Sequence, residues 1–152
     1  MSLEPPSLSA LHRFARKAGD RETGGILAGD YNEALDCARV VKVSAPPRDS
    51  RAGAWSFERG IDGLGDWLAT LWRGRRRMYY LGEWHYHPHA SPEASAQDRA
   101  QMVAVAREKA YACPEPLLVI LGGDADRGWE LRVYVFPVHE GCISLRRIEQ
   151  EG

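Results

Sequence analysis

The sequence lacks the features that mark several large classes of protein. It has three cysteines, Cys37, Cys113 and Cys142, and no C-x-x-C pair, which favours reduced, packing thiols over a disulfide framework. No apolar run approaches the ~18–20 residues of a membrane-spanning helix, and no signal-like segment opens the chain. The formal net charge of -1 gives no general attraction to nucleic acid or acidic membranes. We therefore expect a soluble, cytoplasmic protein that binds neither.

One basic run, from Arg73 to Arg77, stands out against this balanced charge. Its simplest interpretation is a solvated helix end, because arginine near a helix C-terminus suits the helix dipole. A docking patch for an acidic partner or for a nucleic-acid backbone is the alternative.

The length of 152 residues predicts a single domain, 1–152, with its core at about 7–146. We assign no structural role to residues 1–3 and 151–152. Hydrophobic periodicity predicts helices over 7–18, 61–73 and about 95–112, and strands over 22–29, 37–43, 55–57, 78–87, 117–121, 129–136 and 143–146. The wholly apolar run 117–121 indicates a central strand. The expected fold class is α/β, with one mixed sheet flanked by helices.

The most informative pattern is His85-x-His87, followed after seven residues by Ser95 and after two more by Asp98. Alternate residues of a strand share a face, so the two histidines can converge on one ion. A turn near Ser91 followed by a helix would bring Asp98 back to them. Two imidazoles and a carboxylate are a common ligand set for catalytic zinc. The H-E-x-x-H of other zinc proteases and the P-C-x-x-C of nucleobase deaminases are both absent.

Each of these residues also has a simpler explanation. The spacing of Ser95 and Asp98 fits a helix-capping box that needs no metal, and Ser95 can serve both purposes. Glu22 taken alone is an ordinary surface carboxylate. His89 is either an accessory ligand or, as a loop residue, solvated. Cys113 lies far from the motif and favours a packing role.

With Glu22 upstream in Glu-Thr-Gly-Gly, the pattern becomes Glu plus His-x-His-x7-Ser-x2-Asp. In this the chain closely resembles the JAB/MPN (JAMM) metalloproteases, over about residues 7–138. The resemblance implies a JAB/MPN, cytidine-deaminase-like fold in which His85, His87 and Asp98 bind one Zn²⁺ together with a water. It also implies that Glu22 takes the proton of that water and passes it to the leaving amine. Ser95 would then hydrogen-bond the oxyanion.

The resemblance further implies a substrate class. Relatives that keep all these ligands cut isopeptide or peptide bonds after the C-terminal Gly-Gly of ubiquitin-like or sulfur-carrier proteins, beside E1-like and E2-like partners. Gly24 and Gly25 give such a tail close approach or serve sheet packing, and the loops 45–53 and 122–128 are expected to rim the cleft. A non-catalytic scaffold that binds partners and a metallopeptidase acting on ordinary peptides are the alternatives.

Overall fold

The computed structural model describes residues 1–147, which form two β-sheets. The strands of the larger sheet are β1 (Ser2–Leu3), β2 (Thr23–Tyr31), β3 (Ala38–Val43), β6 (Tyr79–Pro88), β7 (Leu117–Asp124), β8 (Gly128–Val135) and β9 (Ile143–Leu145). They follow the order β1-β3-β2-β6-β7-β8-β9, with β1–β3 and β6–β7 parallel and the other pairs antiparallel. A separate hairpin pairs β4 (Arg51–Ala52) with β5 (Phe57–Glu58).

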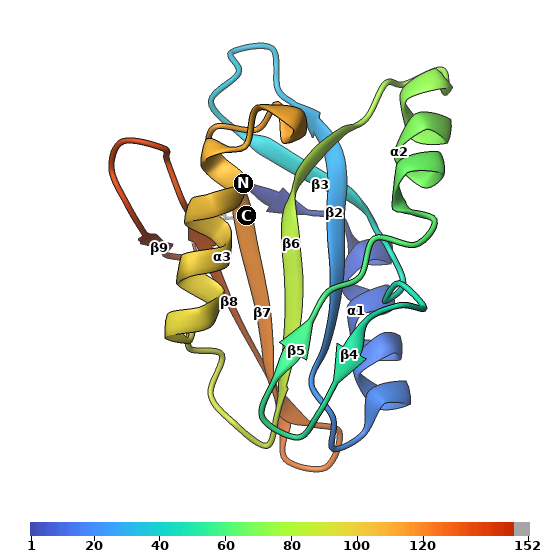
Figure 1. The fold of residues 1–152 in the computed structure, drawn as a ribbon, viewed down its shortest axis with the longest axis vertical. Coiled ribbons are helices and arrows are strands. Elements are labelled where there is room, and N and C mark those ends of the chain that lie inside the picture. Colours follow the sequence, from blue (N-terminus) through green and yellow to red (C-terminus); the bar gives the residue numbers. More distant parts are fainter. Residues whose placement is uncertain (148–152) are drawn as a thin grey trace, which may run out of the picture.

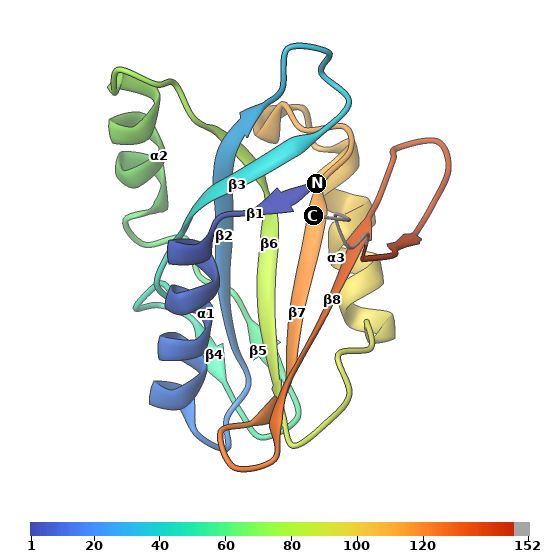
Figure 2. The same cartoon turned by 180° about the vertical axis from the view of Figure 1, so that it is seen from behind.

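Helices cover both faces of the large sheet. They are α1 (Pro5–Ala18), α2 (Leu64–Arg73), α3 (Ala96–Arg107) and the short 3-10 helix η1 (Lys109–Tyr111). Figure 1 shows α2, α3 and the β4–β5 hairpin in front of the sheet, and Figure 2, seen from the opposite side, shows α1 on the other face. The predicted α/β class, a mixed sheet flanked by helices, is confirmed. Among the described residues, no helix combines the length and apolar character needed to cross a membrane.

Two buried layers hold the helices to the sheet. On the α1 face, Leu11 and Ala15 pack with Trp84 and Tyr86 of β6. On the α3 face, Met102 packs against apolar side chains of β7 and β8. Strand β7 lies between β6 and β8 and is buried over its apolar run, which confirms the predicted central strand.

The amino-terminal region contributes more structure than predicted. Ser2–Leu3 forms β1 in parallel register with Arg39 and Val40 of β3, so the expectation that residues 1–3 have no structural role is wrong. Helix α1 begins at Pro5, two residues before the predicted start. Proline suits the first turn of a helix because its fixed φ is helical and the missing N–H has no partner there.

Helix α2 begins at Leu64, three residues later than predicted. Ile61, predicted on its buried stripe, is 73% exposed. The Asp49 carboxylate accepts the N–H groups of Ile61 and Asp62 at 3.0 and 2.9 Å and holds them in a loop. Gly63 then enters the helix in a left-handed conformation. A tertiary contact therefore overrides the local periodicity.

The basic run begins at the end of α2, in agreement with the helix-end interpretation. Arg73 is in the last turn of the helix, Arg76 forms an ion pair with Asp30, and the Arg77 guanidinium lies 5.0 Å from the Trp72 ring centroid. Two members of the run are thus engaged within the chain.

Helix α3 ends at Arg107, earlier than the predicted 112. Glu108 leaves the helical conformation and caps the next element, η1. Its side chain accepts a hydrogen bond from the N–H of Ala110. The predicted strand over 55–57 is shifted as well. Only Phe57 belongs to β5, while Trp55 lies in the hairpin turn and is 87% exposed.

A bulge in β6 determines which of its side chains face α3. Gly82 has a φ of 143°, and a Cβ at this position would collide with the backbone of Leu117 on the adjacent strand. Tyr80 packs in a cluster with Val105 of α3, whereas Leu81 packs in the α1 layer with Trp84. The bulge shifts the alternation of side chains along the strand just before the His85-x-His87 pattern.

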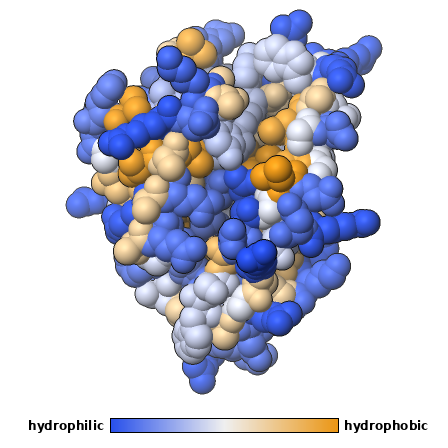
Figure 3. Space-filling model, viewed as in Figure 1, coloured by the Kyte–Doolittle hydropathy of each residue, from blue (hydrophilic) through white to orange (hydrophobic). Residues whose placement is uncertain are grey.

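The outer surface on the α3 side is mainly polar. Figure 3, in the view of Figure 1, shows hydrophilic side chains over most of this face, with apolar side chains in small separate groups. A macromolecule that binds across this face therefore meets a predominantly polar surface.

Candidate metal centre

The end of β6 and the first turn of α3 bring His85, His87 and Asp98 together. The histidines are alternate residues of β6 and share a face, and α3 begins eight residues after that strand ends. One donor atom from each of the three side chains lies within 4.8 Å of the others. All three residues are buried, with 2%, 9% and 7% of their surface exposed, respectively. The structure thus forms the three-residue group that the sequence spacing predicts.

The carboxylate of Asp98 faces both histidines. Its Oδ1 lies 2.8 Å from His85 Nδ1, and its Oδ2 lies 3.5 Å from His87 Nε2. The Phe57 ring stands edge-on to the His85 ring, with 5.8 Å between centroids. His85 is therefore fixed from two sides, by a carboxylate and by an aromatic side chain of the β4–β5 hairpin.

The capping explanation for Ser95 and Asp98 is also realised. Ser95 Oγ accepts the Asp98 N–H at 3.1 Å, and the Ser95 N–H donates to Asp98 Oδ2 at 2.8 Å. Asp98 Oδ1 remains directed at His85. The two explanations are compatible, since the capping box holds Asp98 in the orientation that the three-residue group uses.

Glu22 reaches the same region from β2. The antiparallel register pairs Thr23 with Tyr86 and Gly24 with His85, so one further step places Glu22 opposite His87. Side chains of directly opposed residues lie on one face of a sheet. The Glu22 N–H also donates to the carbonyl of Gly53 at 2.7 Å, which ties this end of β2 to the β4–β5 hairpin.

The electrostatics suit these positions. Burial and the nearby Asp98 carboxylate raise the pKa of Glu22, as expected for a proton acceptor. Burial lowers the pKa of His87, so this imidazole is neutral and able to bind a metal. Burial raises the pKa of Asp98, but hydrogen bonds from His85 and Ser95 more than offset this and bring it to about 2.

Comparison with known proteins identifies the family. The family model of prokaryotic homologs of the JAB domain matches residues 4–134. The chain belongs to this family.

One curated relative and one solved structure are also similar to the chain. The JAB domain is 42% identical over 132 residues to the CD-NTase/cGAS isopeptidase of Enterobacter hormaechei subsp. hoffmannii (strain UCI 50), covering 87% of this chain and 72% of the relative. A solution structure of a Desulfitobacterium hafniense protein matches with a TM-score of 0.66 over 99% of this chain and 93% of the other. Its 18% identity supports the fold alone.

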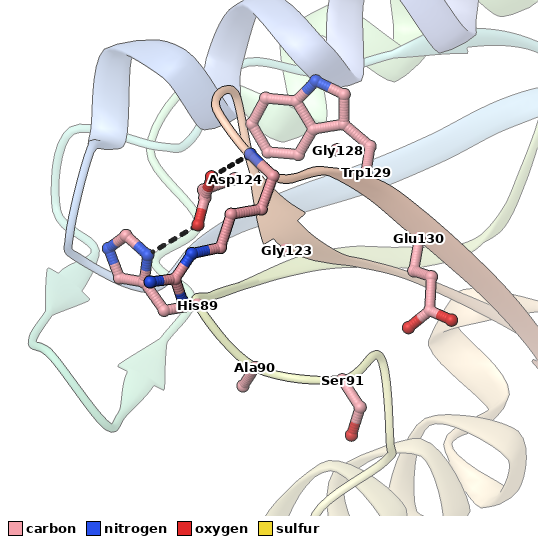
Figure 4. Close-up of a pocket in the computed structure, with 9 residues that line it drawn as sticks. His89, Ala90, Ser91, Gly123, Asp124, Gly128, Trp129 and Glu130 are labelled. Carbon is pink, nitrogen blue, oxygen red and sulfur yellow. Dashed lines mark hydrogen bonds and ion pairs between the residues drawn. The ribbon is translucent and has the colours of Figure 1, made fainter.

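Some expected neighbours of the site lie elsewhere in the JAB domain. The segment 122–128, predicted as a loop, consists of the end of β7, a short turn and the start of β8. Together with residues 89–91 it lines a pocket of about 330 Å³ (Figure 4). The pocket lining includes His89 and Asp124 but none of the three grouped residues. His89 lies 3.0 Å from Asp124 and 2.6 Å from Asp20, with its side chain 51% exposed. His89 therefore belongs to this rim and not to the three-residue group.

Gly24 and Gly25 contribute to internal packing. A Cβ on Gly24 would lie 2.8 Å from the Phe57 ring and 2.9 Å from the His85 ring, and one on Gly25 would lie 2.6 Å from Ser44 Oγ. Of the two roles left open by the sequence, sheet packing is the one that the structure supports. Cys113 is buried and, like the other two cysteines, is a free thiol, as predicted.

One charged residue beside the site was not predicted from the sequence. Glu83 is fully buried on the same face of β6 as His85, and it pairs with Arg59 at 2.8 Å. The available signal was its position two residues before His85, which in a strand places both side chains on one face.

Proposed function

We propose that this JAB domain is a zinc-dependent isopeptidase in which His85, His87 and Asp98 bind the metal. The observation that carries the proposal is the convergence of these three donors. Two imidazoles and a carboxylate suit Zn²⁺, and three protein ligands leave the fourth position that catalytic zinc sites keep open. When bound, zinc supplies Lewis-acid polarisation of the scissile carbonyl and activates water.

The remaining chemistry belongs to two other side chains. Glu22 accepts the proton of the attacking water and returns it to the leaving amine, a role that its raised pKa favours. Ser95 Oγ accepts a hydrogen bond from the Asp98 N–H, which leaves its own hydroxyl proton available. That proton is donated to the oxyanion that forms on the scissile carbonyl.

For the substrate, we propose a protein conjugate whose modifier ends in Gly-Gly and is ubiquitin-like or a sulfur carrier. The relative from Enterobacter, whose name specifies an isopeptidase of CD-NTase/cGAS, supports a CD-NTase-type protein as the amine side of the bond. E1-like and E2-like enzymes would form such a conjugate. A Gly-Gly tail has no side chains, so it can lie extended and be held by main-chain hydrogen bonds.

The first experiment is elemental analysis of the protein purified without chelator, beside Asp98→Asn. We expect about one zinc per chain in the wild type and none in the variant, since the centre loses a charged ligand. A wild-type protein that takes up no zinc, even after zinc is added back, would leave the scaffold alternative in place.

The second experiment tests the reaction with Glu22→Gln. The substrate is a ubiquitin-like protein joined through its terminal Gly-Gly to a lysine of a CD-NTase-type protein. Wild type should cut after the second glycine, whereas Glu22→Gln should keep its zinc and lose roughly 10²–10⁴ in rate. Normal turnover by this variant would exclude Glu22 as the base. Cleavage of ordinary peptides but not of the conjugate would exclude the proposed substrate.

A further inference from the structure

The second ring nitrogen of His85 has a distinct environment. While Nδ1 faces Asp98 at 2.8 Å, Nε2 is buried and has no hydrogen-bond partner at normal length. The nearest acidic atom to Nε2 is Oε2 of Glu83, at 3.5 Å. A buried ring N–H without a hydrogen-bond partner is unfavourable. A small movement of the His85 ring toward the Glu83 carboxylate would give this N–H an acceptor.

Glu83 is held in place from other elements. Arg59, between β5 and α2, donates to Glu83 Oε1 from Nη2 at 2.8 Å and from Nε at 3.0 Å. Gln101 of α3 donates to Oε2 at 2.8 Å. Arg59 is further fixed by donating to Tyr111 Oη at 3.1 Å. The carboxylate facing His85 therefore has little freedom to move.

Stability alone does not account for this network. Glu83 is 0% exposed and the Arg59 side chain only 6% exposed, so both charges have lost their hydration. Buried ion pairs are often no better for stability than apolar residues of similar volume. What distinguishes this ion pair is the orientation of its carboxylate. Glu83 Oε2 faces Nε2 of His85, a residue of the candidate metal centre.

We infer that Glu83 is a positioning residue that accepts the Nε2–H of His85 and thereby leaves Nδ1 free to bind the metal beside Asp98. Arg59 and Gln101 hold the carboxylate in that orientation. Metal-binding histidines generally donate their other ring N–H to such an outer acceptor, which fixes the tautomer and the ring. The inference rests on the proposed function, because it assigns a role toward the proposed zinc.

The test uses two charge-neutral double variants, because removing Glu83 alone would leave the buried Arg59 unpaired. Arg59→Met/Glu83→Leu removes the ion pair and the acceptor that faces His85. Arg59→Met/Glu83→Gln is the matched control, since its amide oxygen preserves an acceptor at the same place. Thermal unfolding establishes that each variant is folded.

Zinc affinity, measured by competition with a chromophoric chelator, is the first readout. The Leu variant should bind zinc about 10–100-fold more weakly than wild type, while the Gln variant stays much closer to wild type. A folded Leu variant with unchanged zinc affinity would overturn the inference.

The second readout needs no metal. In ¹⁵N-histidine-labelled, zinc-free wild type, NMR should show a His85 Nε2–H proton protected from solvent exchange. That resonance should persist in the Gln variant and disappear in the Leu variant. Its absence from wild type would overturn the role of Glu83. Failure of wild type to bind zinc would instead overturn the proposed function, and the resonance distinguishes the two failures.

Discussion

Asp98 uses its two carboxylate oxygens differently. Oδ2 accepts the Ser95 N–H and completes the helix cap, while Oδ1 faces His85. Ser95 is similarly divided, because its oxygen caps the helix while its proton remains free. Single side chains thus couple the start of α3 to the candidate metal centre, and under the proposed function we expect a substitution at either residue to affect both stability and activity.

Ser95→Ala should distinguish the two roles of Ser95, because we expect a small loss of stability and a large loss of kcat. Loss of the cap costs about 1 kcal/mol of stability, whereas loss of an oxyanion donor costs roughly 10²–10³ in kcat. Chemical denaturation and steady-state kinetics measure the two effects. Ser95→Thr keeps a hydroxyl and is the control. A kcat unchanged in Ser95→Ala would mean that this hydroxyl serves only as a cap.

For single residues, sequence spacing was informative where the candidate ligands follow one another closely in the chain. The grouping of His85, His87 and Asp98 follows from strand alternation and a capped helix, both visible in the sequence. The burial of Glu83 was not predicted because its partner Arg59 lies 24 residues away in the chain. Nothing local indicates that a carboxylate will have such a partner, so its role emerges only from the tertiary structure.

Among the elements, strand β6 depends most on one residue. Gly82 has a φ of 143° and lies against the backbone of β7, so a side chain there meets both strain and collision. We expect Gly82→Ala to destabilise the protein by about 3 kcal/mol or more and to weaken zinc binding, because the bulge orients the strand that carries both histidines.

Gly65→Ala is the matched control for this prediction. Gly65 lies in α2, and a Cβ there would meet no atom within 4 Å. Alanine should be neutral or stabilising by up to about 1 kcal/mol at this position. Urea unfolding of both variants provides the measurement. Equal stability of Gly82→Ala and wild type would show that the bulge tolerates a side chain.

Element type was more predictable than element boundaries. The aromatic residues of β6, the apolar run of β7 and the apolar stripe of α1 were sufficient to predict those elements. The start of α2 was not, because Asp49, a residue distant in sequence, holds Ile61 and Asp62 outside the helix. Periodicity describes one element at a time and carries no information about such contacts.

Considered as a whole, the molecule concentrates charge at the point where its layers meet. Strands β2 and β6, helix α3 and the β4–β5 hairpin all contribute contacts to the region around His85. Burial lowers the pKa of His85, but the hydrogen bond with Asp98 and the nearby Glu83 carboxylate overcome this effect and raise the pKa to about 9. Protonation of this one group is therefore linked to the stability of the entire fold.

The pH dependence of stability is expected to differ between the zinc-free protein and the proposed zinc-bound protein. In zinc-free protein His85 is protonated in the fold below pH about 9, whereas the unfolded chain titrates near 6.5. Its contribution, roughly 3 kcal/mol at most, is complete below pH 6.5 and is lost as the pH rises toward 9. Zinc bound to His85 as proposed would displace this proton, so its binding should strengthen over the same interval.

We therefore expect the increase in Tm caused by zinc to grow from pH 6.5 to 9, while the Tm of the chelator-treated protein falls. Thermal unfolding with and without zinc at each pH tests this expectation. Subtracting the two Tm values at each pH removes the contribution of groups that titrate alike in both forms. A zinc-induced increase that stays constant over this range would mean that zinc displaces no proton from His85. The ligand assignment at this histidine would then be wrong.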